Sequence, residues 1–104
     1  MAQNMYDGMD GLLGFQWDEE KNLLNQRKHG VSFEEARIVF YDPQHLVLDD
    51  LSHSKVEKRF FCYGKATQGI LTVRFTLRDN RIIRIIGAAY WRQGKGIYEK
   101  ENGC

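Results

Sequence analysis

The sequence predicts one α+β domain with the element order β-α-α-β-β-β-β, in which two helices pack on one face of a mainly antiparallel sheet. Two capped helical segments precede Pro43, the hydrophobic pattern changes to period two after it, and turn residues separate the later apolar runs. The 104 residues suit one domain, and the 42% apolar content suffices for one core. We expect residues 15–104 to form this domain and residues 1–14, which lack periodicity, to form a mobile tail.

A short strand and a capped helix open the predicted domain. Residues 15–17 alternate apolar and polar side chains, as a short strand does. Asp18 is a suitable N-cap, and the two glutamates after it favour the first turn of a helix. The helix is expected to end at His29, because Gly30 is well suited to a left-handed C-cap.

The second predicted helix begins directly after Gly30. Ser32 and Glu35 form a capping box, with Val31 and Ala36 placed as a hydrophobic staple. Asp42 ends the helix, because the residue before a proline avoids the helical region. The buried stripe of this helix is predicted to contain Phe33, Ala36, Val39 and Phe40.

Four strands follow Pro43. They are predicted at residues 46–48, 59–63, 70–76 and 82–89, with turn residues between them. Strands joined by short loops pair antiparallel. The stretch from Tyr90 to Lys100 either extends the last strand and then coils, or turns helical.

The last two strands are expected to form a hairpin with one basic face. A two-residue turn at Asp79-Asn80 sets Phe75 opposite Arg84, so that Arg84 lies among apolar neighbours. Such an arginine needs a partner, for example Glu34 or Glu35, unless the register differs. The opposite, basic face is predicted to carry Thr72, Arg74, Thr76, Arg78, Arg81 and Ile83.

The charge is divided unevenly along the chain. The net charge is −6 over residues 1–54 and +8 over residues 55–98, although the whole chain carries only +1. A basic half indicates a surface that meets phosphates. The alternative is that the two halves are ordinary solvated faces that neutralise each other in the fold.

Several function classes are not supported by the residue spacing. His29, His45 and His53 have no metal-ligand spacing, and Cys62 and Cys104 form no CxxC pair, so we expect no metal and no cofactor. Cys62 is expected in the core, and His29 suits the dipole at the end of a helix. No signal peptide or membrane span is predicted, so the expected location is cytoplasmic and reducing.

The remaining polar residues suggest chemistry on RNA. Arginines stabilise negative charge on a reacting phosphate, glutamate, tyrosine or histidine moves protons, and aromatic side chains stack on bases. The same inventory serves a metal-independent ribonuclease or a basic RNA-binding sheet. It contains Glu57, Arg59, Arg74, Arg78, Arg84, Tyr90, Trp91, Arg92 and Lys95.

Two motifs resemble those of the BrnT-type toxins. They are the stretch from Phe15 to Asn22, which reads FQWDEEKN, and the stretch from Arg27 to Ala36, which reads RKHGVSFEEA. The resemblance continues at residues 40–43, at His53, Glu57 and Arg59, and over residues 82–88, and covers about residues 15–99.

This resemblance implies a RelE-like fold and a toxin of a type II toxin–antitoxin pair. Its expected activity is metal-independent endoribonuclease cleavage through 2′-hydroxyl attack, which inhibits growth. The expected partner is a BrnA-type ribbon-helix-helix antitoxin, which neutralises the toxin in a hetero-oligomer and binds operator DNA. The alternative is a non-catalytic RNA- or antitoxin-binding module, a degenerate toxin that acts as corepressor.

The sequence departs from the commoner family pattern at two places. Where many members read TER, this chain reads Thr76-Leu77-Arg78, and where many read ISAR it reads Ile86-Gly87-Ala88-Ala89. Arg92 or Lys95 is expected to supply the missing positive charge. The predicted catalytic residues are Arg59, Arg78, Arg92, Lys95, Tyr90, His29 and Glu57, and the predicted RNA-binding residues are Arg74, Arg81, Trp91 and Lys58.

Overall fold

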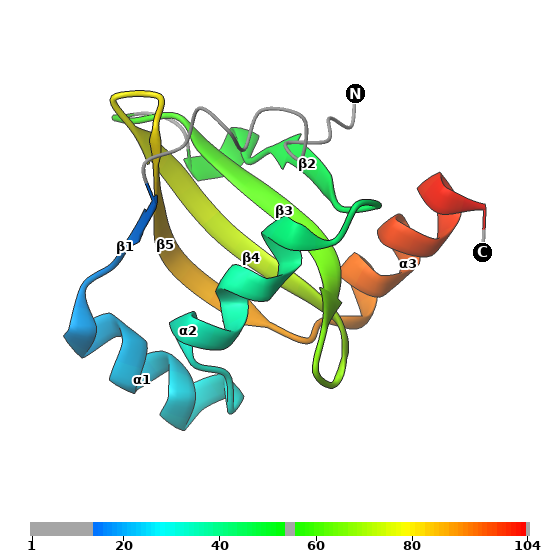
Figure 1. The fold of residues 1–104 in the computed structure, drawn as a ribbon, viewed down its shortest axis with the longest axis horizontal. Coiled ribbons are helices and arrows are strands. Elements are labelled where there is room, and N and C mark those ends of the chain that lie inside the picture. Colours follow the sequence, from blue (N-terminus) through cyan, green and yellow to red (C-terminus); the bar gives the residue numbers. More distant parts are fainter. Residues whose placement is uncertain (1–13, 54–55, 104) are drawn as a thin grey trace.

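A five-stranded sheet forms the centre of the structure, a computed structural model that describes residues 14–53 and 56–103 (Figure 1). The strand order is β1-β5-β4-β3-β2, with β1 parallel to β5 and every other neighbouring pair antiparallel. The predicted α+β fold class is confirmed. The expected mobile tail lies outside the described residues except for Gly14, which begins β1. The strands are β1 (Gly14–Gln16), β2 (Leu46–Asp49), β3 (Arg59–Ala66), β4 (Gly69–Arg78) and β5 (Ile82–Ala89).

The first helix, α1 (Glu19–His29), has the predicted caps and lies beside β5. The Asp18 side chain accepts a hydrogen bond of 2.9 Å from the backbone of Glu20, and Gly30 adopts the left-handed conformation with φ of 69°. The buried Asn25 side chain donates to the carbonyl of Ala88 at 2.9 Å and accepts from its N–H at 3.3 Å. Asn25 therefore satisfies backbone groups at the β5 edge that β1 does not reach.

The second helical segment covers one face of the sheet. It consists of α2 (Phe33–Ala36) and the 3₁₀ helix η2 (Arg37–Tyr41), and the Ser32 hydroxyl accepts the predicted cap bond from Glu35 N at 3.0 Å. A Cβ atom on Gly64 would lie 2.8 Å from Val39 Cβ, so only glycine lets η2 lie this close to β3. The predicted stripe, which contains Phe33, Ala36, Val39 and Phe40, is fully buried.

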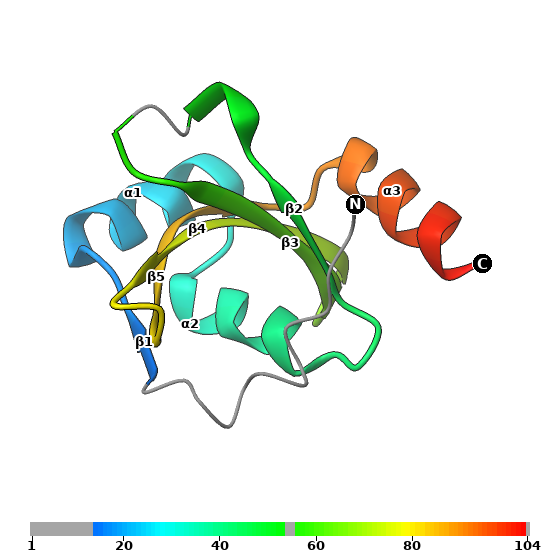
Figure 2. The same cartoon turned by 90° about the horizontal axis from the view of Figure 1, so that it is seen from above.

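A third helix, α3 (Arg92–Asn102), follows β5. Of the two alternatives predicted for the stretch from Tyr90 to Lys100, the helical one is therefore confirmed. It packs against β3 and β4 on the side of the sheet away from α2 (Figure 2). Its buried Tyr98 hydroxyl donates to Asp42 Oδ2 at 2.7 Å. The same carboxylate accepts from the backbone N–H groups of Lys65 at 2.8 Å and Gln44 at 2.9 Å.

The predicted register of the β4–β5 hairpin is wrong by one residue. Arg78 pairs with Ile82, so the turn has three residues, and both Asp79 and Asn80 have positive φ, 55° and 58°. Arg84 consequently pairs with Thr76 on the basic face and donates to Gln16 Oε1 at 2.8 Å, rather than to Glu34 or Glu35. Ile83, predicted on the basic face, is fully buried in the core. A β-bulge between Arg74 and Phe75 shifts the register again.

None of the helices among the described residues is long and apolar enough to cross a membrane.

The Asp42–Tyr98 contact predicts a pH-dependent contribution to stability. Burial raises the pKa of Asp42, but the hydrogen bonds from Lys65, Gln44 and Tyr98 outweigh it, so the pKa lies below the ordinary value of 3.8. The stabilisation is therefore present above pH 3.8 and lost as the pH falls through the folded-state pKa. We expect Tyr98→Phe to lower the free energy of unfolding by about 1–2 kcal/mol at pH 7, measured by urea denaturation.

The exposed Tyr41 provides the matched control, because Tyr41→Phe removes a hydroxyl from a side chain that is 58% exposed. The difference in the free energy of unfolding between Tyr98→Phe and the wild type should shrink as the pH falls through the folded-state pKa of Asp42, which lies below 3.8. If the two proteins differ in their free energy of unfolding by the same amount at neutral and acid pH, the Tyr98 hydroxyl does not stabilise the fold through the ionised Asp42.

Candidate functional site

Four arginines share the face of the sheet opposite α2, which we call the open face. In a strand, alternate side chains point to the same side, and Arg59 pairs with Thr76 while Phe61 pairs with Arg74. The β5 residue Arg84 also pairs with Thr76. The open-face arginines, which come from three neighbouring strands, are Arg59, Arg74, Arg78 and Arg84.

Glu57 lies between two of these arginines. Its carboxylate oxygens lie 3.7 Å from the Arg59 guanidinium and 3.7 Å from the Arg78 guanidinium. All three side chains are partly exposed. Lys58 is more exposed and lies 3.6 Å from the Asp49 carboxylate. The structure thus brings together three of the predicted catalytic residues in one solvent-accessible group.

Arg74 is held in place by Asp50, which the sequence pattern did not indicate as a site residue. Its Nε atom lies 3.1 Å from Oδ2 of Asp50, a side chain that is only 1% exposed. The guanidinium carbon also lies 5.3 Å from the centre of the Phe61 ring. The sequence predicted only turn residues between the strands at 46–48 and 59–63. A buried carboxylate needs a cation, and that need is visible only once the fold shows Asp50 to be buried.

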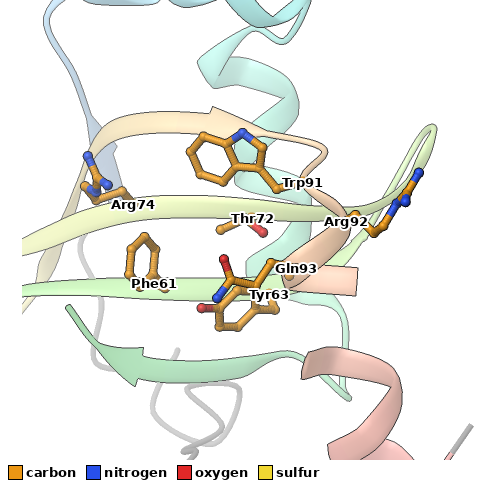
Figure 3. Close-up of a pocket in the computed structure, with 8 residues that line it drawn as sticks. Phe61, Tyr63, Thr72, Arg74, Trp91, Arg92 and Gln93 are labelled. Carbon is orange, nitrogen blue, oxygen red and sulfur yellow. The ribbon is translucent and has the colours of Figure 1, made fainter. Parts of the chain in front are cut away.

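A hollow of about 450 Å³ lies between the open face and the first turn of α3 (Figure 3). We call it the Trp91 hollow. An ideal Cβ on Gly94 would lie 1.9 Å from Thr72 Oγ1 and 3.0 Å from Tyr63 Cδ1, so α3 begins directly on the strands. The Thr72 hydroxyl beneath it is buried and has no hydrogen-bond partner among the described residues. The lining residues are Phe61, Tyr63, Thr72, Arg74, Trp91, Arg92, Gln93 and Gly94.

Two of the predicted site residues lie beside Trp91. The His29 ring, at the end of α1, meets the Trp91 ring edge-on with 5.8 Å between the ring centres. Lys95, one turn into α3, lines a smaller hollow of about 300 Å³ that also includes Trp91 and Arg92. Arg81 is exposed in the hairpin turn. Neither His29 nor Lys95 lines the Trp91 hollow.

Tyr90 points away from the open-face arginines. Its hydroxyl hydrogen-bonds to the Glu35 carboxylate on α2 and accepts from Gln68 N at 3.2 Å. Burial, and next the bond to Glu35, raise the pKa of Tyr90 above its ordinary value of 10.0. This tyrosine joins the β3–β4 turn to α2, and it stays protonated at neutral pH.

Within residues 14–53 and 56–103, no three His, Cys, Asp or Glu side chains gather in a group able to hold a metal ion. Cys62 is buried, and burial raises the pKa of its thiol.

Comparison with known proteins gives one family and one fold. A family model described as "Ribonuclease toxin, BrnT, of type II toxin-antitoxin system" matches residues 17–94. None of the curated proteins compared with the chain matches it. The crystal structure of the Brucella abortus ribonuclease toxin BrnT, at 22% sequence identity, superposes with a TM-score of 0.57 over 73% of this chain and 92% of that one. At this identity the structural likeness shows a shared fold.

The close approach at Gly94 predicts that a larger residue there destabilises the packing of α3 on the strands. Gly94→Ala should lower the free energy of unfolding by about 1–3 kcal/mol in urea denaturation, because the added methyl overlaps Thr72 Oγ1. The loss should be smaller in a Thr72→Ala background, where that oxygen is gone. Gly96→Ala is the matched control on the same helix: nothing lies within 4 Å of its Cβ position, so it should stabilise. Equal effects at the two glycines would contradict the close approach.

Proposed function

We propose that this protein is an endoribonuclease that cleaves RNA without a metal ion. The premise is that the chain belongs to the family of BrnT ribonuclease toxins of type II toxin–antitoxin systems. The observation that carries this proposal is the position of Glu57 between the guanidinium groups of Arg59 and Arg78, at 3.7 Å from each. A phosphate held by the two arginines would lie next to a carboxylate able to take a proton.

In the proposed reaction the ribose 2′-hydroxyl attacks the adjacent phosphorus. Glu57 accepts the proton of this hydroxyl, and Arg59 and Arg78 stabilise the charge that builds up on the pentacoordinate phosphate. The bond between phosphorus and the 5′-oxygen breaks, and the departing oxygen takes up a proton from solvent. The products are a 2′,3′-cyclic phosphate and a 5′-hydroxyl end.

The two departures from the commoner family pattern do not remove the group formed by Glu57, Arg59 and Arg78. Leu77, which stands at the position of the family glutamate, pairs with Ile83 on the α2 side of the sheet, so the open face is unchanged. Ala89, which stands at the position of the family arginine, pairs with Thr72. Arg92 lines the same hollow as Thr72, and its guanidinium points away from Thr72 in Figure 3, so the charge that we propose it supplies lies at the edge of the hollow.

A second function is a non-catalytic RNA- or antitoxin-binding module on the same fold. The observation that favours it is that Tyr90 and His29, predicted to move protons, lie away from Arg59 and Arg78. In that case the arginines would bind RNA without cleaving it.

Alanine variants separate the two functions. Arg59→Ala and Arg78→Ala should fold normally and lose cleavage of purified RNA by about a hundredfold or more, because one oriented charge typically contributes about 3–4 kcal/mol. Arg37→Ala, an exposed arginine on η2, should keep wild-type activity. Cleavage should persist in EDTA and leave 2′,3′-cyclic phosphate ends.

The reaction fails as written if EDTA abolishes cleavage or if both variants cut RNA at the wild-type rate. The binding module is favoured instead if the pure protein binds RNA but releases no product, and if added salt reproduces the effect of the variants.

Family membership implies an antitoxin partner and an RNA target. We propose that the antitoxin is of the BrnA ribbon-helix-helix type, that it carries the operator-DNA contacts of the hetero-oligomer, and that an acidic segment of it covers the open face. One surface does not hold two polyanions at once, so RNA and antitoxin should compete. We expect saturating antitoxin to abolish binding of a fluorescent RNA, measured by anisotropy. Simultaneous binding without loss of either affinity would contradict this.

A further inference from the structure

Trp91 stands where three hollows of the surface meet. It lines the Trp91 hollow, the smaller hollow with Lys95, and a third hollow beside α1 that includes Lys21, Lys28 and His29. The indole is 43% exposed, and none of the described residues that line the three hollows carries a carboxylate. An aromatic platform surrounded by cations is suited to a stacked base on an anionic chain.

We propose that the Trp91 hollow binds one unpaired base of the RNA, stacked on Trp91, at a nucleotide other than the one whose 2′-hydroxyl attacks. This inference rests on the proposed function only in taking RNA as the substrate class. It adds a substrate-positioning subsite, separate from the group formed by Glu57, Arg59 and Arg78.

The floor of the hollow is prepared for a flat ligand. The Arg74 guanidinium lies over the Phe61 ring and is fixed there by the buried Asp50, so its position is set before a ligand arrives. Fixed side chains lose little conformational freedom on binding. Gln93, whose side chain lies beside Tyr63 in Figure 3, brings an amide with both a donor and an acceptor, which is suited to the polar edge of a base.

The spacing along β3 separates the two subsites. Phe61 and Tyr63, which line the hollow, lie two and four residues after Arg59, which at about 3.3 Å per residue amounts to about 7 and 13 Å along the strand. Both subsites lie on the open face. A single RNA strand that follows β3 and β4 therefore meets the arginine pair first and the aromatic platform farther along.

The test measures binding without cleavage. A fluorescent single-stranded RNA with 2′-O-methyl groups lacks the attacking hydroxyl, so its dissociation constant is independent of catalysis. We expect Trp91→Ala to raise this constant by about five- to a hundredfold, the usual effect of losing one stacking partner. Trp91→Phe should restore most of the affinity. Tyr41→Ala, which removes an exposed aromatic from η2 on the other side of the sheet, should change nothing.

A scan of the oligonucleotide with one abasic nucleotide at a time locates the bound base. One position should weaken binding to wild-type protein, and Trp91→Ala should be insensitive to that position alone. Gln93→Ala should reduce the difference in affinity among the four bases at that position.

The subsite is overturned if Trp91→Ala binds the RNA as the wild type does, if abasic positions all act alike, or if the variant loses only antitoxin binding. Failure of the catalytic proposal looks different. Arg59→Ala and Arg78→Ala would then cut RNA normally, while the abasic position and its dependence on Trp91 would remain.

Discussion

The carboxylate of Asp42 holds together the parts of the molecule on which the open face depends. It accepts hydrogen bonds from the backbone of Gln44 and Lys65 and from the Tyr98 hydroxyl. These bonds join the end of η2, the strand β3 and the helix α3. Because Tyr98 is fixed in this way, the first turn of α3 packs against the strands at Gly94. This turn forms one wall of the Trp91 hollow.

The charge arrangement on the open face follows from how carboxylates are distributed among the arginines. Asp50 is buried and its Oδ2 lies 3.1 Å from Arg74 Nε, so this close ion pair orients the guanidinium. Glu57 is partly exposed and lies at longer distance from Arg59 and Arg78. Solvent weakens such contacts, and a phosphate is therefore able to compete for these two arginines. Arg74 is therefore suited to positioning the RNA, and Arg59 and Arg78 are suited to stabilising the reacting phosphate.

The local elements were predictable because their signals lie within a few residues of each other. The Asp18 cap, the Gly30 stop and the Ser32–Glu35 cap each depend on one backbone turn, and all appear as expected. The hairpin register was missed because Asp79 and Asn80 both adopt positive φ in a three-residue turn. A bulge at Arg74 then moves the register again, and neither feature has a clear signal in the residue types.

The sequence by itself determined the α+β class, the two capped helices, the strands after Pro43 and the gathering of basic residues on strands, since capping and alternation act between near neighbours. Tertiary structure decided which of these basic residues share a site. The contacts of Asp50 with Arg74, Glu57 with Arg78, Tyr98 with Asp42 and Gly94 with Thr72 join residues more than twenty positions apart. Such contacts form only where the whole sheet sets the register and the burial, because their energy depends on the surroundings that the fold creates.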